Sequence, residues 1–171
     1  MKSNKKFLLL GLFWLIIIIV FIVNKEYTLR TGREVLLKTE PVDPRDLFRG
    51  DYVILNYEIS SLDLSMLSGR ADEFMPGDGV YVALDPSIKC ASPIGIYKTE
   101  PKTGVFVKGT IRNISRNNLS VKYGIENYFV PEGKGREIER LRGDNLVIRA
   151  SVDRFGTAAI KDLLINGNEC R

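Results

Sequence analysis

Gly50-Asp51-Tyr52-Val53-Ile54-Leu55-Asn56-Tyr57 is the stretch that decides how this chain folds. It is rich in β-branched and aromatic residues, and side chains along an extended strand point alternately to opposite faces. Val53, Leu55 and Tyr57 therefore share one face, which we expect to point into a core. Gly50-Asp51 favours a turn that starts the strand, because glycine accepts positive φ and aspartate bonds nearby backbone N–H groups.

Short strand-like runs continue on both sides of this stretch, and turn residues separate them. We expect strands near residues 34–40, 52–59, 79–84, 95–99, 105–114, 119–123, 127–130, 146–152 and 157–165, with single short helical pieces near 64–67 and 135–141. Many short strands at regular spacing predict a mainly β fold with a minor α component. The expected domain covers residues 33–171 and is a β-barrel or a sandwich.

Two stretches carry a family resemblance. The octapeptide fills every fixed position of a G-D-Y-x-x-L-x-Y signature, and residues 123–135 (YGIENYFVPEGKG) form an aromatic strand that runs into P-E-G. On these stretches the chain resembles the GDYXXLXY family of membrane-anchored bacterial proteins. The resemblance implies association with a multi-spanning membrane protein and points to no particular reaction.

The same two stretches supply the candidate site residues. The structural motif consists of Gly50, Asp51, Tyr52, Leu55 and Tyr57. The candidate partner- or ligand-binding residues are Asp51, Tyr52, Tyr128 and Glu132, because a carboxylate beside a tyrosine can bind a cation, an amine or a partner surface. The alternative is purely structural: a turn at Asp51, a packed aromatic pair, and Glu132 at the start of a helix, where a negative charge is favourable.

A long apolar run precedes the β domain. Phe7 to Val23 is seventeen residues without a charge, which as a helix measures roughly 25 Å, close to the hydrocarbon thickness of a bilayer. We interpret residues 7–23 as a transmembrane helix, 1–6 as a short basic tail and 24–32 as a juxtamembrane stalk. A cleaved signal peptide is the rival interpretation, but the run is long and no A-x-A-like site follows it.

The charges around this run favour one orientation. Lys2, Lys5 and Lys6 lie close before it, whereas the Lys and Arg residues that follow are more spread out. Long C-terminal domains are translocated largely regardless of their charge. We therefore expect a single-pass protein of the cell (inner) membrane, with its N-terminus inside and its domain outside the cytoplasm.

Composition narrows the classes of function. The chain has 25 Lys and Arg against 21 Asp and Glu, and three of the lysines precede the apolar run, so the domain is nearly neutral. A nucleic-acid partner is not expected, since phosphate binding needs concentrated basic charge. The chain has no histidine, which excludes Ser-His-Asp and Cys-His catalysis and histidine-bearing zinc sites. We predict no metal and no cofactor.

The two cysteines, Cys90 and Cys170, are too few for a Cys₄ zinc site. Outside the cytoplasm they can form a disulfide that closes a loop of about 80 residues. Two unrelated free thiols are the alternative.

Three classes of function follow from these observations. The first is a non-catalytic binding or accessory module that is held at the membrane by its helix and acts with an integral membrane partner. The second is a small-ligand-binding β-barrel. The third is a signal-peptidase-like Ser/Lys protease. It is the least supported, because Ser65-Met66 lacks the proline expected two residues after the methionine and follows the R-G-D strand instead of preceding it.

Overall fold

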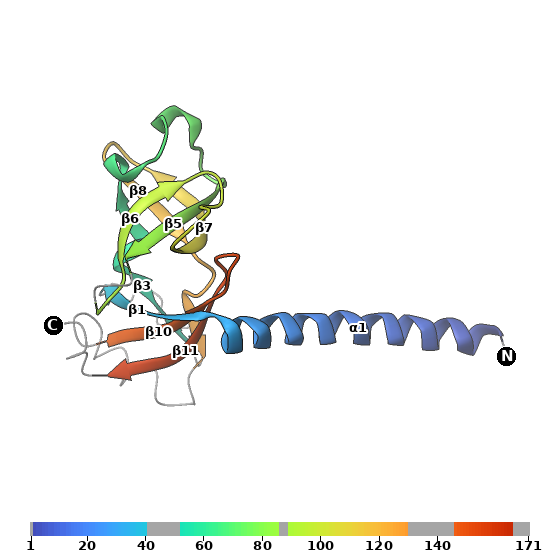
Figure 1. The fold of residues 1–171 in the computed structure, drawn as a ribbon. Coiled ribbons are helices and arrows are strands. Elements are labelled where there is room, and N and C mark those ends of the chain that lie inside the picture. The colour runs from blue at the N-terminus through green and yellow to red at the C-terminus, as the bar shows by residue number, and fades with distance from the viewer. Residues whose placement is uncertain (1, 41–51, 86–88, 130–145, 166–171) are drawn as a thin grey trace.

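A computed structural model describes residues 2–40, 52–85, 89–129 and 146–165. One long helix, α1, projects as a straight arm from a β-rich domain (Figure 1). The expected class is confirmed: the chain is mainly β, and a single N-terminal apolar helix precedes a barrel- or sandwich-like domain.

Helix α1 runs from Lys2 to Thr31. It includes the predicted apolar run and continues without a break through residues 24–31, so the expected stalk is helical. Most apolar side chains of the run are exposed, and the most apolar window is 0% buried. α1 is long and apolar enough to cross a membrane. A helix that is apolar all round needs a partner or a lipid environment to cover it.

The described strands form three antiparallel sheets. Their bounds are β1 (Arg33–Glu40), β2 (Tyr52–Ile54), β3 (Asn56–Tyr57), β4 (Ser61–Asp63), β5 (Gly79–Asp85), β6 (Ser92–Tyr97), β7 (Val105–Ile114), β8 (Asn118–Lys122), β9 (Asn127–Phe129), β10 (Leu146–Val152) and β11 (Ala158–Ile165). The orders are β11-β10-β1-β3, β4-β8-β7-β5-β6 and the two-stranded β2-β9. Short 3₁₀ turns η1 (Glu58–Ser60), η2 (Leu64–Met66) and η3 (Ala71–Glu73) interrupt the strands.

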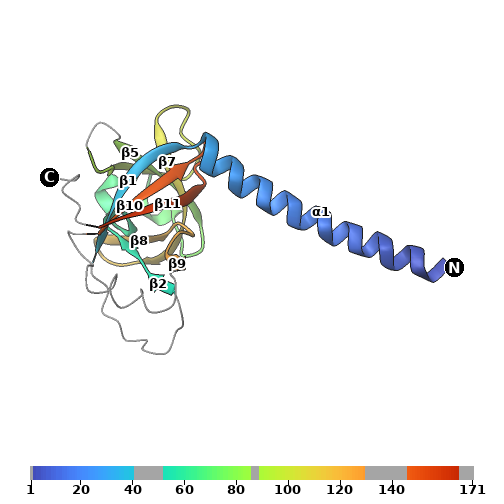
Figure 2. The ribbon, with the colours of Figure 1, turned by 90° about the horizontal axis from the view of Figure 1, so that it is seen from below.

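One core joins the two larger sheets. β1 buries every second residue, as the period of two requires when one face of a strand is covered. The buried cluster combines Leu37 and Ile148 of the four-stranded sheet with Val82 and Val107 of the five-stranded sheet. Figure 2 shows β1, β10 and β11 running side by side across the domain.

The signature stretch differs from the expected single strand. It divides at Leu55: β2 pairs with β9, and β3 pairs with β1. The stretch passes from one sheet to another within six residues, which a sequence pattern cannot reveal because both halves have the same strand composition. β4 was not expected either. The helix predicted over 135–141 lies outside the described residues.

A second Gly-Asp pair, Gly77-Asp78, lies in the described part of the chain and also precedes a strand. Gly77 has φ of +96°, a conformation that favours glycine, and Asp78 accepts a hydrogen bond from the backbone N–H of Met75 at 3.1 Å. β5 begins directly after this turn, as we expect at Gly50-Asp51.

The end of α1 is fixed to the domain by buried polar contacts. The Thr28 hydroxyl donates to a carboxylate oxygen of Asp153 at 2.9 Å, and the Ser151 hydroxyl donates to the Thr28 carbonyl at 2.7 Å. Thr28 and Ser151 are 3% and 0% exposed. Because breaking these bonds would leave buried polar groups unpaired, they join the end of α1 to β10 and to Asp153 directly after it.

Candidate partner interface

The two stretches that carry the family resemblance lie side by side in space. β2 pairs with β9 in the register Tyr52 to Phe129, Val53 to Tyr128 and Ile54 to Asn127. In Figure 2 these strands lie together at one edge of the domain. We call the pair the β2–β9 ribbon.

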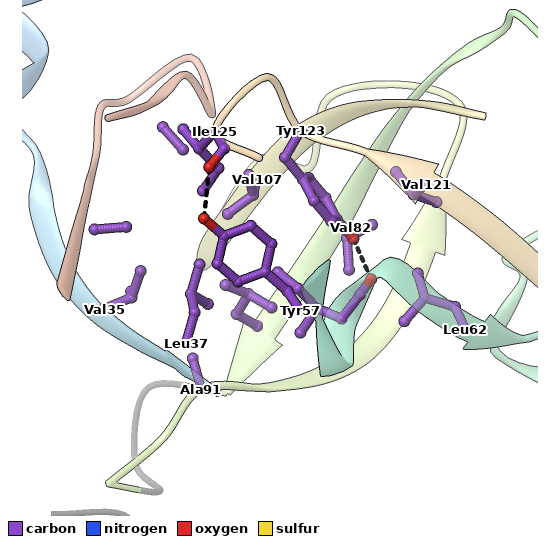
Figure 3. Close-up of a cluster of buried hydrophobic side chains, with 14 of the residues drawn as sticks. Val35, Leu37, Tyr57, Leu62, Val82, Ala91, Val107, Val121, Tyr123 and Ile125 are labelled. Atoms are coloured by element: carbon purple, nitrogen blue, oxygen red, sulfur yellow. Dashed lines mark hydrogen bonds between the residues drawn. The ribbon is translucent and has the colours of Figure 1, made fainter. Parts of the chain in front are cut away.

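Leu55 and Tyr57, the signature residues that follow β2, hold the two stretches together. Leu55 and Tyr57 are 2% and 0% exposed. The Leu55 backbone N–H donates to the Glu126 carbonyl at 2.7 Å, and the Tyr57 hydroxyl donates to the Ile125 carbonyl at 2.6 Å (Figure 3). The last two fixed positions of the signature therefore provide an apolar side chain for the core and a phenol that binds the other stretch.

A second tyrosine makes the reverse connection. The Tyr123 hydroxyl donates to the Ile59 carbonyl at 2.5 Å, from the second stretch back to the segment after the first (Figure 3). Burial, with a smaller contribution from the Glu126 charge, raises the pKa of both Tyr57 and Tyr123 far above the ordinary value of 10.0. Both phenols therefore stay protonated and keep their hydrogen bonds.

Glu126 shapes the turn before β9. One of its carboxylate oxygens accepts from the Tyr123 N–H, and the other accepts from the Gly124 N–H at 2.9 Å. A carboxylate that binds two backbone N–H groups satisfies donors that the turn leaves unpaired. Glu126 is thus a structural residue, and the turn it holds sets where β9 starts.

The outer side of the ribbon is exposed and carries apolar side chains beside Asn127. Phe129 is 79% exposed and Ile54 is 36% exposed, while Tyr128 is partly buried against the core. Exposed aromatic side chains on a rigid support are typical of protein interfaces. The ribbon is therefore the candidate interface of the domain.

The predicted site residues are placed as follows. Tyr52 and Tyr128 belong to the two strands of the ribbon, in neighbouring pairs of its register. Gly50, Asp51 and Glu132 lie outside the described residues. Cys90 is 4% exposed and is not a free thiol, whereas Cys170 lies outside the described residues, so the bridge between them stays a prediction.

The described residues provide no assembled metal site, and Ser65 contacts an aspartate. Within them no group of three or more His, Cys, Asp or Glu side chains gathers to hold a metal ion. Ser65 lies in η2, and its backbone N–H donates to Asp63 at 2.7 Å. Hydrogen bonds from Ser65 lower the pKa of the Asp63 carboxyl, which makes that carboxylate a poor base for activating a hydroxyl.

A comparison with protein-family models matches residues 14–163, most of the chain, to the model described as GDYXXLXY protein. The chain belongs to the GDYXXLXY family. Comparisons with curated proteins and with solved structures found no match. In this GDYXXLXY protein, the described part of the family's signature has a structural role. Leu55 and Tyr57 connect the signature stretch to the segment before β9.

Sequence reasoning assigned no role to Glu126 or Phe129. Glu126 acts through the backbone N–H groups of Tyr123 and Gly124, which only the folded turn brings to its carboxylate. Phe129 received no role because exposure of one residue in an apolar run depends on which face the sheet covers.

Alkaline pH should destabilise this GDYXXLXY protein through Tyr57 and Tyr123. Above about pH 10 the unfolded chain loses phenolic protons that the folded chain keeps, so the free energy of unfolding falls by up to about 1.4 kcal/mol per pH unit for each phenol. Urea unfolding across this range measures the fall. Tyr57→Phe should make it shallower, and an identical slope in both proteins would contradict the assignment.

Proposed function

We propose that this GDYXXLXY protein is a membrane-anchored, non-catalytic accessory module whose β2–β9 ribbon binds an integral membrane partner. α1 spans the cell (inner) membrane with its N-terminus inside, and the domain lies outside the cytoplasm. The single observation that carries the proposal is the exposed Phe129 on the ribbon built by the family's two characteristic stretches.

Membrane anchoring of the domain makes a weak interface sufficient for binding. A domain confined to the membrane surface meets a membrane partner at a high effective concentration, so a small interface is sufficient. The joint at Thr28 and Ser151 adds orientation, because a domain fixed to its helix loses less rotational freedom on binding than one on a flexible tether.

The packing of the domain argues against the small-ligand-binding barrel. Val80, Val82, Val107 and Ile111 of the five-stranded sheet are 0–1% exposed and belong to one continuous buried cluster. These side chains therefore pack together where a ligand between the sheets would need space.

Site-specific photocrosslinking in native membranes tests the proposed interface. A photoreactive phenylalanine analogue in place of Phe129 should trap one partner that resists alkaline carbonate extraction, whereas the analogue at Ile94, 63% exposed on β6, should not. Phe129→Asp should weaken co-purification of that partner at least about tenfold, since a central aromatic anchor contributes about 2 kcal/mol or more. Recovery of the protein alone, or of the same products from both positions, would contradict the proposal.

A further inference from the structure

A cavity of about 410 Å³ lies where the hairpin between β10 and β11 meets α1. The helix contributes Phe21, Asn24 and Lys25 to its lining, and the hairpin contributes Phe155, Thr157 and Ala158. This site is separate from the β2–β9 ribbon, and nothing in the proposed function uses it.

The lining changes from apolar to polar along α1. Phe21 belongs to the apolar run 7–23 and is 73% exposed, whereas Asn24 and Lys25 follow the run directly. The helix rises about 1.5 Å per residue, so Phe21 and Lys25 are roughly 6 Å apart along its axis. That distance is comparable with the headgroup layer on one side of a bilayer, about 5 to 8 Å.

The tip of the hairpin places an aromatic side chain and a cation next to each other. Phe155 is 50% exposed at the tip, and the Arg154 guanidinium carbon lies 4.5 Å from the centre of its ring. An apolar ring can enter the boundary between headgroups and acyl chains, while a long basic side chain keeps its charge among the phosphates.

One carboxylate fixes this tip relative to the helix. An oxygen of Asp153 accepts from the backbone N–H groups of Phe155 and Thr157, both at 2.9 Å, and its other oxygen accepts from the Thr28 hydroxyl. The depth of Phe155 is therefore set by the depth at which α1 sits.

We propose that the hairpin tip at Arg154 and Phe155 is a membrane-surface contact and that the cavity holds a phospholipid of the bilayer that α1 spans. Acyl chain contacts continue from Phe21 to Phe155, and the lipid phosphate lies at the level of Lys25 and Arg154. The proposal rests on the proposed membrane anchoring. Its consequence is that the domain has one fixed orientation on the membrane.

Quenching by acyl-chain-brominated phosphatidylcholine in reconstituted vesicles tests the contact. Trp14, the single tryptophan, reports on the anchor in the native chain. In a Trp14→Phe background, the indole of Phe155→Trp should be quenched at least about two-fold more than that of Ile94→Trp, because a group at the acyl boundary meets the bromine atoms. β6, which carries Ile94, runs along the side of the domain away from α1 in Figure 1.

The outcomes separate the two proposals. Quenching of Trp14 together with equal, weak quenching of the Phe155→Trp and Ile94→Trp indoles would overturn the lipid contact and leave the anchor standing. Absence of Trp14 quenching would overturn both. The unfolding midpoint of Phe155→Trp, measured in the same vesicles, is the control for an intact hairpin. It should be unchanged, because Phe155 is half-exposed and its substitution fills no buried space.

Discussion

Tyr57→Ala should lower the free energy of unfolding of this protein by several kcal/mol. Tyr57 is completely buried, and truncation of a buried aromatic side chain costs about 3–5 kcal/mol, a large part of the roughly 5–15 kcal/mol that stabilises an ordinary domain. The variant also leaves the Ile125 carbonyl without its 2.6 Å hydrogen bond. Chemical denaturation of the full chain in detergent, followed by circular dichroism of the β signal, measures the loss.

Two further variants show what the tyrosine contributes. Tyr57→Phe keeps the ring and removes the hydroxyl, so its cost should be the smaller one of an unpaired buried carbonyl, about 1–3 kcal/mol. Phe129→Ala truncates an aromatic residue that is 79% exposed, and its cost should be within about 0.5 kcal/mol. Equal destabilisation by Tyr57→Ala and Phe129→Ala would show that the signature tyrosine is not a core residue.

Gly32→Ala should loosen α1 from the domain. A Cβ at Gly32 would lie 2.3 Å from the Ser151 hydroxyl oxygen and 2.6 Å from the Thr28 carbonyl oxygen. The carbonyl belongs to the backbone and already accepts hydrogen bonds from Ser151 and Gly32, so the helix end or β10 must move. Such overpacking costs about 1–3 kcal/mol.

Trypsin cleavage at Lys25 and Arg30 measures this loosening. Cleavage needs local opening of the helix end, so the rate should rise about 5- to 150-fold if opening becomes easier by the same free energy. Gly11→Ala is the matched control, because a Cβ at Gly11 meets nothing within 4 Å. Equal cleavage of the Gly32→Ala and Gly11→Ala proteins would mean that α1 and the domain are not rigidly joined.

The membrane-contact and interface proposals share the membrane anchor but depend on different residues of the domain. Phe129 lies on the β2–β9 ribbon, and Phe155 lies at the hairpin beside α1. The joint at Thr28 connects them mechanically, since it fixes the orientation of the whole domain relative to the helix. Gly32→Ala should therefore weaken the contribution of Phe155 without changing the exposed surface at Phe129.

Local pattern and composition were sufficient for the class of the fold. The apolar run 7–23 is visible because a membrane-length helix needs only uninterrupted apolar residues, and the strands from 79 onward follow from alternation and turn residues. The inward direction of Leu55 and Tyr57 also follows from the period of two in a strand. Each of these properties depends on neighbours in the sequence.

Tertiary structure alone decided the connections between distant residues. The hydrogen bonds from Tyr57 to Ile125 and from Thr28 to Asp153 link segments 68 or more residues apart. The division at Leu55 separates two halves of the signature stretch that have the same strand composition but join different sheets. Such pairings are selected by the packing of the whole core, because many registers satisfy the local preferences equally well. For the same reason the sequence marks Phe129 and Phe155 as apolar residues, and only the folded chain leaves them exposed.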